Sequence, residues 1–422
     1  MSNGSLIRLR ASEEEKAGRP SHLSLRYLPI QLAVLAVMLN NWDFPALGLN
    51  FSDPLVILGI VSLLFLRPKL PVSHYLIVVL VGAVVGANIV AASVIDGSYS
   101  MTNGSLYLGK VVLYALFILM LYNYVVQRGF LTEALRILVA WTLIACGIGL
   151  YITFVLQSGI GLPYEFFWEF TRKDQASYDF GDSSGIIRNR SIFSEPQHFG
   201  FFLNTVLLFC MFNSAKIRVS NPVLVIISVT AITTLSFSTL PITVVLIAAY
   251  ILRRHNVAGA VVLGVGSVAL VLLAGTGPFA EAIRTTIFDR FDAIVSGRDG
   301  SAVSRLSGSW DYFNPDHILT GNGIGSTPDI FNNYAYALTE LGIFPLLLMV
   351  LLSVILLRRN LALGLYFIFF TATKGGYLSA YYWVFLAFFF IFSYTYSATT
   401  TAASRTSAAD PVSKKKNFTL SA

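Results

Sequence analysis

The chain has 422 residues, of which 55% are hydrophobic and only 12% charged, and its mean hydropathy is +0.69. An ordinary soluble domain carries roughly 25% charged residues, so this composition excludes a water-soluble fold built around one core. The net charge is +7. The cations are scattered over loop edges instead of forming one basic face, so nucleic acid is not expected as a partner.

Apolar stretches of membrane-spanning length fill most of the chain. A bilayer-spanning helix needs about 20 mostly apolar residues, and fewer where it is short or broken. Windows of that size predict an all-α integral membrane protein with about 12 transmembrane helices. The predicted helices are Tyr27–Trp42, Pro54–Leu66, Val72–Ile95, Tyr107–Val126, Leu131–Leu156, Ile192–Phe212, Pro222–Ser236, Leu240–Leu252, Val257–Gly275, Asn333–Leu357, Leu361–Thr373 and Leu378–Tyr396.

Positive charge predicts the orientation of these helices. Short cytoplasmic loops hold an excess of Lys and Arg. The alternation fits at every short loop if the N-terminus is cytoplasmic, and the short outer loops 43–53 and 96–105 contain neither residue. We therefore expect cytoplasmic tails at 1–26 and 399–422 around a membrane domain at 27–398. The first tail has no apolar core, so it is not read as a cleaved signal peptide.

Two large periplasmic loops are expected, at about 157–191 and 276–332. In the first, the aromatic and acidic run Tyr164–Phe170 suits a membrane interface, and Tyr178–Gly185 reads as flexible. In the second, Phe279–Val295 has helical apolar spacing and predicts an amphipathic helix on the outer leaflet. The glycines of Gly321–Gly325 follow no strand and precede no Lys-Ser/Thr pair, so they predict backbone turns rather than a phosphate loop.

Ionisable residues at the ends of the spans are the candidates for chemistry. Such groups are costly in a bilayer and are functional candidates by default. Glu195 and His198 are three residues apart near the outer end of the sixth predicted helix, where helical spacing would set them on one face. They follow Arg188 and Arg190 closely, so cations, a carboxylate and an imidazole are expected in one region at the membrane surface. The alternative is an ion pair and a backbone-bonded histidine that only hold the helix.

Glu340 lies about a third of the way into the tenth predicted helix. It is expected either to join a cavity with Glu195 and His198 or to pair with Lys374. Cys146 and Cys210 lie in the middle of spans, which predicts packing roles. The sequence indicates no metal site and no cofactor.

Three segments resemble the bacterial O-antigen and exopolysaccharide polymerases called Wzy, within the wider group that includes O-antigen ligases. They are the Arg188-x-x-Ser-x-Phe-x-Glu-Pro segment, the Asp299-x-Ser-x-x-x-Arg305 run with Gly321-x-Gly-x-Gly, and Asn333 through Glu340-Leu-Gly-Ile. The resemblance covers the middle and last thirds of the chain. Ligases of the group commonly have a histidine beside the asparagine before the helix that holds Glu340. Here those positions are Asn332 and Asn333, which disfavours a ligase, although His317 lies nearby.

The resemblance implies a GT-C-like glycosyltransferase of the bacterial inner membrane that needs neither nucleotide sugar nor metal. It would transfer a growing glycan from undecaprenyl pyrophosphate onto a lipid-linked repeat unit. By motif position, Arg188 and Arg305 match the loop arginines of the family. Its expected partners are the lipid-linked oligosaccharide, the bilayer, a chain-length regulator and an export complex.

The chemistry of such a transfer suits the residues. A sugar on a lipid diphosphate already has a good leaving group, so cations must hold the departing charge and a base must deprotonate the attacking hydroxyl. Arginine binds phosphate bidentately. Glu195 is the predicted base, with His198 as its orienting partner or substitute. The predicted catalytic or substrate-binding residues otherwise comprise Arg188, Arg305, Arg190, Arg284, Arg290, Arg298, His317 and Glu340.

Two other functions remain open. A flippase for lipid-linked oligosaccharides or a twelve-helix solute transporter would fit the number of spans, but neither an internal repeat nor a long central cytoplasmic loop is visible in the sequence. A non-enzymatic scaffold of an export complex would also be compatible with the two long loops.

Overall fold

The computed structural model describes residues 24–44, 49–171, 187–254, 289–328, 330–374 and 376–395. Within these ranges the protein is all-helical, apart from one antiparallel pair of two-residue strands, β1 (Asp43–Phe44) and β2 (Leu49–Asn50). The predicted tails, the span Val257–Gly275, the Tyr178–Gly185 segment and most of the predicted amphipathic helix Phe279–Val295 lie outside the described residues.

Three helices of the described part are long and apolar enough to cross a bilayer, α4 (Val72–Ile95), α5 (Met101–Arg128) and α6 (Leu131–Ser158). Shorter apolar helices accompany them, so the sequence and the structure together indicate a membrane protein. The shorter ones include α2 (Leu28–Met38, after the 3₁₀ turn η1, Leu25–Tyr27), α3 (Ser52–Leu66), α7 (Pro196–Phe212), α8 (Asn221–Thr233), α15 (Leu361–Thr373) and α16 (Ala380–Phe392). A further helix covers 240–254.

The tenth predicted helix, Asn333–Leu357, is wrong as one continuous span. Gly342 divides it into α13 (Asn333–Leu341) and α14 (Ile343–Arg359). Gly342 has a positive φ of 83°, a conformation that other residues rarely adopt, and the Ile343 N–H bonds the Ile318 carbonyl outside the helix at 2.9 Å. The sequence prediction missed the break because the apolar pattern continues through it.

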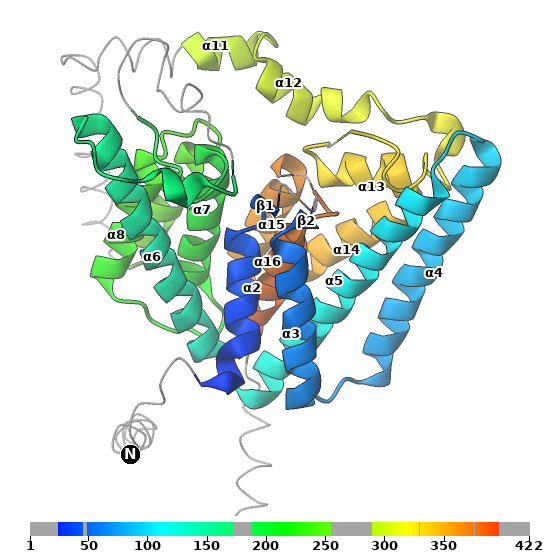
Figure 1. Ribbon diagram of the computed structural model, residues 1–422, viewed down its shortest axis with the longest axis horizontal. Coiled ribbons are helices and arrows are strands. Elements are labelled where there is room, and N and C mark those ends of the chain that lie inside the picture. The colour runs from blue at the N-terminus through cyan, green and yellow to red at the C-terminus, as the bar shows by residue number, and fades with distance from the viewer. Residues whose placement is uncertain are drawn as a thin grey trace, which may run out of the picture.

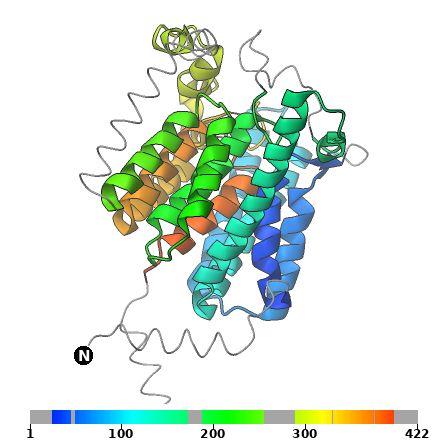
Figure 2. The same ribbon diagram turned by 90° about the vertical axis from the view of Figure 1, so that its left-hand side faces the viewer.

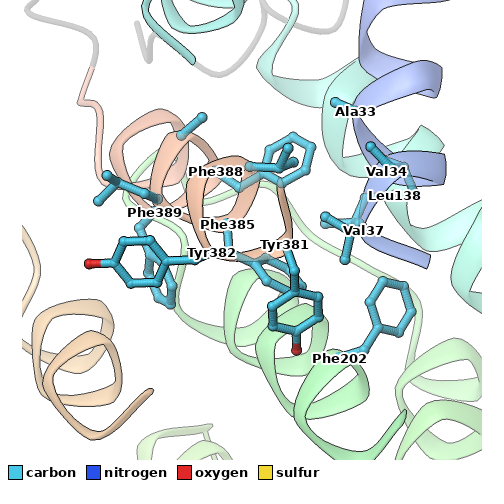
Figure 3. Packing of buried hydrophobic residues seen from close by; sticks show 14 of the residues in the cluster. Ala33, Val34, Val37, Leu138, Phe202, Tyr381, Tyr382, Phe385, Phe388 and Phe389 are labelled. Carbon is cyan, nitrogen blue, oxygen red and sulfur yellow. The ribbon is translucent and has the colours of Figure 1, made fainter. Parts of the chain in front are cut away.

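The core surrounds α16 and α7, in which almost every side chain is buried. Figure 3 shows Phe385, Phe388 and Phe389 of α16 packed among side chains of neighbouring helices, including Phe202 of α7 and Val37 of α2. The Phe209 ring of α7 lies 5.1 Å from that of Phe389. These contacts explain why two helices too short to be counted as spans are the most completely enclosed.

The outer surface of the bundle is apolar. Large hydrophobic side chains are exposed along α3, α4, α8 and α14, among them Phe65, Val94 and Leu347. A soluble monomer rarely exposes such extended apolar surface, whereas a lipid-facing surface requires it. Figure 2 shows α6, α7 and α8 side by side on one face of this bundle.

Short helices lie beyond one end of the bundle. They are α11 (Asp289–Val295) and α12 (Gly300–Leu306), with the 3₁₀ turns η5 (Gly308–Trp310) and η6 (Pro315–His317) after them. In both views α11 and α12 lie outside the same end of the long helices (Figures 1 and 2). α12 begins where Asp299 caps it by accepting the Ala302 N–H at 2.7 Å, and it contacts α15. The second predicted loop thus contributes ordered helices to that end.

Candidate functional site

The N-terminus of α7 holds the predicted acid and imidazole, but not in the expected geometry. α7 begins at Pro196, and Glu195 precedes it in an extended conformation (φ −145°, ψ 150°). Helical spacing therefore does not set Glu195 and His198 on one face, which corrects the geometric argument for pairing them. His198 is half-buried in the first turn of the helix.

A hydrogen-bonded relay orients His198 instead. Asn40, just after α2, accepts the Tyr381 N–H at 3.2 Å and the Ser379 hydroxyl at 2.9 Å, both from the start of α16. Its amide nitrogen donates to Asn41 Oδ1 at 2.9 Å. Asn41 Nδ2 in turn lies 2.9 Å from His198 Nδ1 and 2.6 Å from Ser194 Oγ. Ser194 Oγ is 2.8 Å from the same ring nitrogen, so the relay joins α16, α2 and α7 at one end of the bundle.

Arg305 of α12 reaches the same place. Its Nη2 donates to Gln197 Oε1 at 2.8 Å, and Gln197 is the residue before His198. The guanidinium carbon also lies 5.0 Å from the centre of the Phe331 ring. The structure thus places Arg305 against the residue before His198, although Arg305 and His198 are 107 residues apart in the sequence.

A polar pocket of about 640 Å³ opens beside the relay. Amide side chains line it together with the Asp43 and Glu169 carboxylates and the Ser194 hydroxyl. A volume of this size is in the range of ligand pockets. Its lining also includes residues of the first predicted loop, namely Phe170 and Thr171.

The two arginines before α7 are held by the protein in different ways. Arg190 is buried, with its guanidinium carbon 3.5 Å from the centre of the Trp168 ring, and it donates to the Ser194 carbonyl at 3.2 Å. Trp168 belongs to the 3₁₀ turn η2 (Glu165–Trp168) and is itself buried. Arg188 is partly exposed and donates from Nε to the Thr234 carbonyl, just after α8, at 3.3 Å. Arg190 therefore fixes the segment that carries Ser194, while its role as a substrate ligand stays a prediction.

Three further candidate arginines are Arg284, Arg290 and Arg298. Arg284 lies outside the described residues, and only the backbone of Arg290, in α11, is described. Arg298 is exposed and donates from Nε to Ser296 Oγ at 2.8 Å. Their part in substrate binding stays a prediction.

Glu340 is fully buried in α13 and holds a loop. Its carboxylate accepts the Gly325 N–H at 3.0 Å, the Thr327 N–H at 3.0 Å, the Thr327 hydroxyl at 2.8 Å and the Tyr377 hydroxyl at 2.6 Å. These bonds satisfy both oxygens without a substrate and without Lys374. The geometry therefore gives Glu340 a structural role, which differs from both arrangements expected from the sequence.

The glycine loop Gly321–Gly325 is a set of tight turns, as expected, and it is anchored to α4. All three of its glycines have positive φ, between 68° and 100°. Asn88 of α4 donates to the Thr320 and Glu340 carbonyls and accepts the Ile324 N–H at 3.0 Å. Tyr99 donates to the Ile324 carbonyl at 2.9 Å. The loop thus packs against the end of α4 and the turn that joins it to α5.

His317 lies on the far side of this loop. Its Nδ1 is 2.9 Å from Asn322 Oδ1, and it lines a separate pocket of about 330 Å³ with Asp96, Asn314 and Thr327. Two hydrogen bonds from Ser98 lower the pKa of the exposed Asp96 carboxyl. His317 is therefore part of a different pocket from the one at the His198 relay.

Several residues of the relay escaped the sequence analysis. Asn40, Asn41 and Ser194, together with Gln197 beside the relay, were given no chemical role, because uncharged polar residues at the ends of spans are common in any membrane helix. Only the meeting of three helix ends singles them out. Among the described residues, no group of three or more His, Cys, Asp or Glu side chains is arranged to hold a metal, and Cys146 and Cys210 are buried free thiols.

No family model matches the chain, and searches of curated proteins and of solved structures found no relative. Fold and site together define the general class of protein. The chain is an all-helical membrane protein with a polar, cation-bearing site at one end of its bundle.

Proposed function

We propose that the protein is a polysaccharide polymerase, which transfers a glycan chain from undecaprenyl pyrophosphate to a lipid-linked repeat unit at the periplasmic face of the bacterial inner membrane. The proposal includes about 12 spans of GT-C-like arrangement, two large periplasmic loops and two cytoplasmic termini. It rests on the resemblance of the Arg188, Asp299 and Asn333 segments to Wzy polymerases, together with the charge alternation of the loops.

The observation that carries the proposal is the contact of Arg305 with Gln197, next to His198. It joins the second long loop to the first turn of α7, which follows the first long loop, as a shared headgroup site would require. A diphosphate leaving group needs cations in a water-poor setting, and Arg305 lies over an aromatic ring at the edge of an apolar bundle. The adjacent pocket has the amide and carboxylate lining that sugar hydroxyls bind.

The residues divide the work as follows. Arg305, with Arg188, holds the diphosphate and stabilises its charge as the glycosidic bond breaks. Glu195 remains the proposed base for the acceptor hydroxyl, since it directly precedes α7 and its side chain makes no capping hydrogen bond to that helix. The lipid tail would lie against the apolar outer face of the helices.

Deletion of the gene separates the candidate functions. Loss of a polymerase leaves single lipid-linked repeats outside the cytoplasmic membrane, loss of a flippase leaves them inside, and loss of a ligase leaves finished chains on the lipid carrier. We expect the first result. Accumulation on the cytoplasmic side would refute the proposal.

Arg305→Ala tests the site in the complemented strain. It should abolish long-chain product at normal protein level. The matched control is Arg254→Ala. Arg254 also donates from its guanidinium to an amide side chain, Asn221 Oδ1 at 3.0 Å, but Asn221 is the first residue of α8 and has no part in the relay. Normal chain length in Arg305→Ala, or equal loss in Arg254→Ala, would contradict the assignment.

A further inference from the structure

The hydrogen bonds of the relay determine which nitrogen of His198 carries the proton. The Tyr381 backbone N–H can only donate, so the Asn40 side-chain atom that it contacts is the oxygen, and Asn40 presents its NH₂ group to Asn41. Asn41 must then accept with its oxygen and donate with its nitrogen. That nitrogen faces His198 Nδ1 at 2.9 Å, so Nδ1 accepts and carries no proton.

A neutral imidazole with a bare Nδ1 carries its proton on Nε2. Ser194 fits this tautomer, since its oxygen accepts from Asn41 at 2.6 Å and lies 2.8 Å from Nδ1, to which a hydroxyl can donate. No described residue hydrogen-bonds Nε2. His198 therefore presents an N–H donor on the side that the relay leaves open.

Two cations and two polar groups lie in this part of the fold. Arg305 contacts Gln197, the residue before His198. Lys374 Nζ lies 6.0 Å from the centre of the Tyr381 ring. Within the described part of the chain, the Tyr381 hydroxyl and Asn333 Nδ2 are buried without a hydrogen-bond partner. Asn333 Oδ1 accepts from the N–H groups of Gly376 and Tyr377, which are two and three residues after Lys374.

We infer that His198, Arg305 and Lys374 form an oxyanion site, and that Asn40, Asn41 and Ser194 are positioning residues that hold His198 as a neutral Nε2–H donor rather than as a base. The ligand class is a phosphate or diphosphate group. Its source as a lipid-linked diphosphate rests on the proposed function, whereas the anion site and the tautomer stand without it. Lys374 thereby becomes a member of the site.

The tautomer is tested by nitrogen NMR on the full chain, labelled with ¹⁵N-histidine in detergent micelles. The chain has five histidines, and loss of one pair of signals in His198→Gln assigns the residue. We expect an unprotonated Nδ1 and a protonated Nε2. A proton on Nδ1 would overturn the inference.

Asn41→Asp should reverse this arrangement, because a carboxylate accepts where the amide donated and draws a proton to Nδ1. Asn50→Asp is the matched control. Asn50 lines the same pocket but makes no bond to the His198 ring, so this substitution adds the same charge without touching the ring nitrogen. An identical response of the two variants would contradict the relay, as a purely structural role gives no reason for the proton to move.

Binding is tested by titrating inorganic pyrophosphate into the same preparation. His198→Leu should bind about 10- to 100-fold more weakly, the usual effect of losing a hydrogen bond to a charged group. His198→Gln keeps an N–H donor at the position of Nε2 and should recover most of that loss. Equal weakening in both variants, or none in either, would refute the donor role.

Vesicles that carry a polyprenyl diphosphate separate the two sources of the anion. Tighter binding to these vesicles than to pyrophosphate supports the lipid-linked ligand, and equal binding overturns that part. None of these measurements needs polymer synthesis. If the protein binds pyrophosphate but deletion of its gene leaves polymer length normal, the proposed function is wrong and the anion site is still supported.

Discussion

Glu340 and His198 are ionisable side chains at helix ends of one bundle, but the protein surrounds them differently. Glu340 accepts four hydrogen bonds from Gly325, Thr327 and Tyr377, so each carboxylate oxygen has two donors of its own chain. The relay bonds His198 at Nδ1 alone, and Arg305 contacts the residue before it. A buried ionisable group that its own chain satisfies on every side is structural, and one that is satisfied on a single side is available to a ligand.

The largest expected effect is on stability at Glu340. Glu340→Ala leaves the N–H groups of Gly325 and Thr327 and the Tyr377 hydroxyl buried without an acceptor. At about 1–3 kcal/mol for each unsatisfied group, the free energy of unfolding should fall by about 3 kcal/mol or more. Thermal unfolding in detergent micelles measures this loss, and an unchanged midpoint would contradict the structural role of Glu340.

Gly323 tests the loop that Glu340 holds. It has a φ of 100°, and a Cβ there would lie 2.6 Å from the Cβ of Ala92. Gly323→Ala should therefore cost about 2 kcal/mol from strain and overpacking. Gly86→Ala in α4 is the control, since a Cβ at Gly86 meets nothing within 4 Å and should gain up to about 1 kcal/mol. Equal unfolding midpoints for the two variants would show that the loop is not packed as described.

Arg190 tests the distinction between structural residues and residues that are available to a ligand. Its stacking on Trp168 and its bond to the Ser194 carbonyl predict that Arg190→Ala loses about 1–2 kcal/mol of unfolding free energy. Arg190→Lys should recover little, because Lys lacks the planar fork that stacks and donates together. If Arg190→Ala left stability intact but abolished pyrophosphate binding, Arg190 would belong to the anion site instead.

The smallest effect on stability is expected at Arg305. It is partly exposed and contacts Gln197 and Phe331 from a short helix. Arg305→Ala should change the unfolding free energy by less than about 1 kcal/mol, as at most surface positions. A loss as large as that of Glu340→Ala would mean that Arg305 is part of the scaffold.

The sequence predicted the helices better than it predicted the site. α4 and α15 have the expected bounds, because an uninterrupted apolar run leaves the chain few alternatives to a helix. It also singled out His198, since ionisable residues are rare near a span, and Arg305 through the family resemblance of its motif. The break at Gly342 was missed because hydrophobicity carries no information on backbone φ.

The relay could not have been predicted, for a related reason. Asn40, Asn41 and Ser194 acquire meaning only when the ends of α2, α7 and α16 meet, and periodicity does not say which helix ends are neighbours. Similarly, the four donors to Glu340 come from a glycine loop and a helix terminus that are separated from one another by about 50 residues. A lone acidic residue in an apolar segment signals importance, and only its partners distinguish structure from chemistry.

The most direct test compares Arg305→Ala with Glu340→Gln in a strain that lacks the native protein, with polysaccharide chain length measured per amount of folded protein. We expect a normal protein level and no long chains for Arg305→Ala. For Glu340→Gln we expect a reduced protein level, with chains of native length from the molecules that fold. Long chains from Arg305→Ala, together with a fully folded but inactive Glu340→Gln, would contradict it.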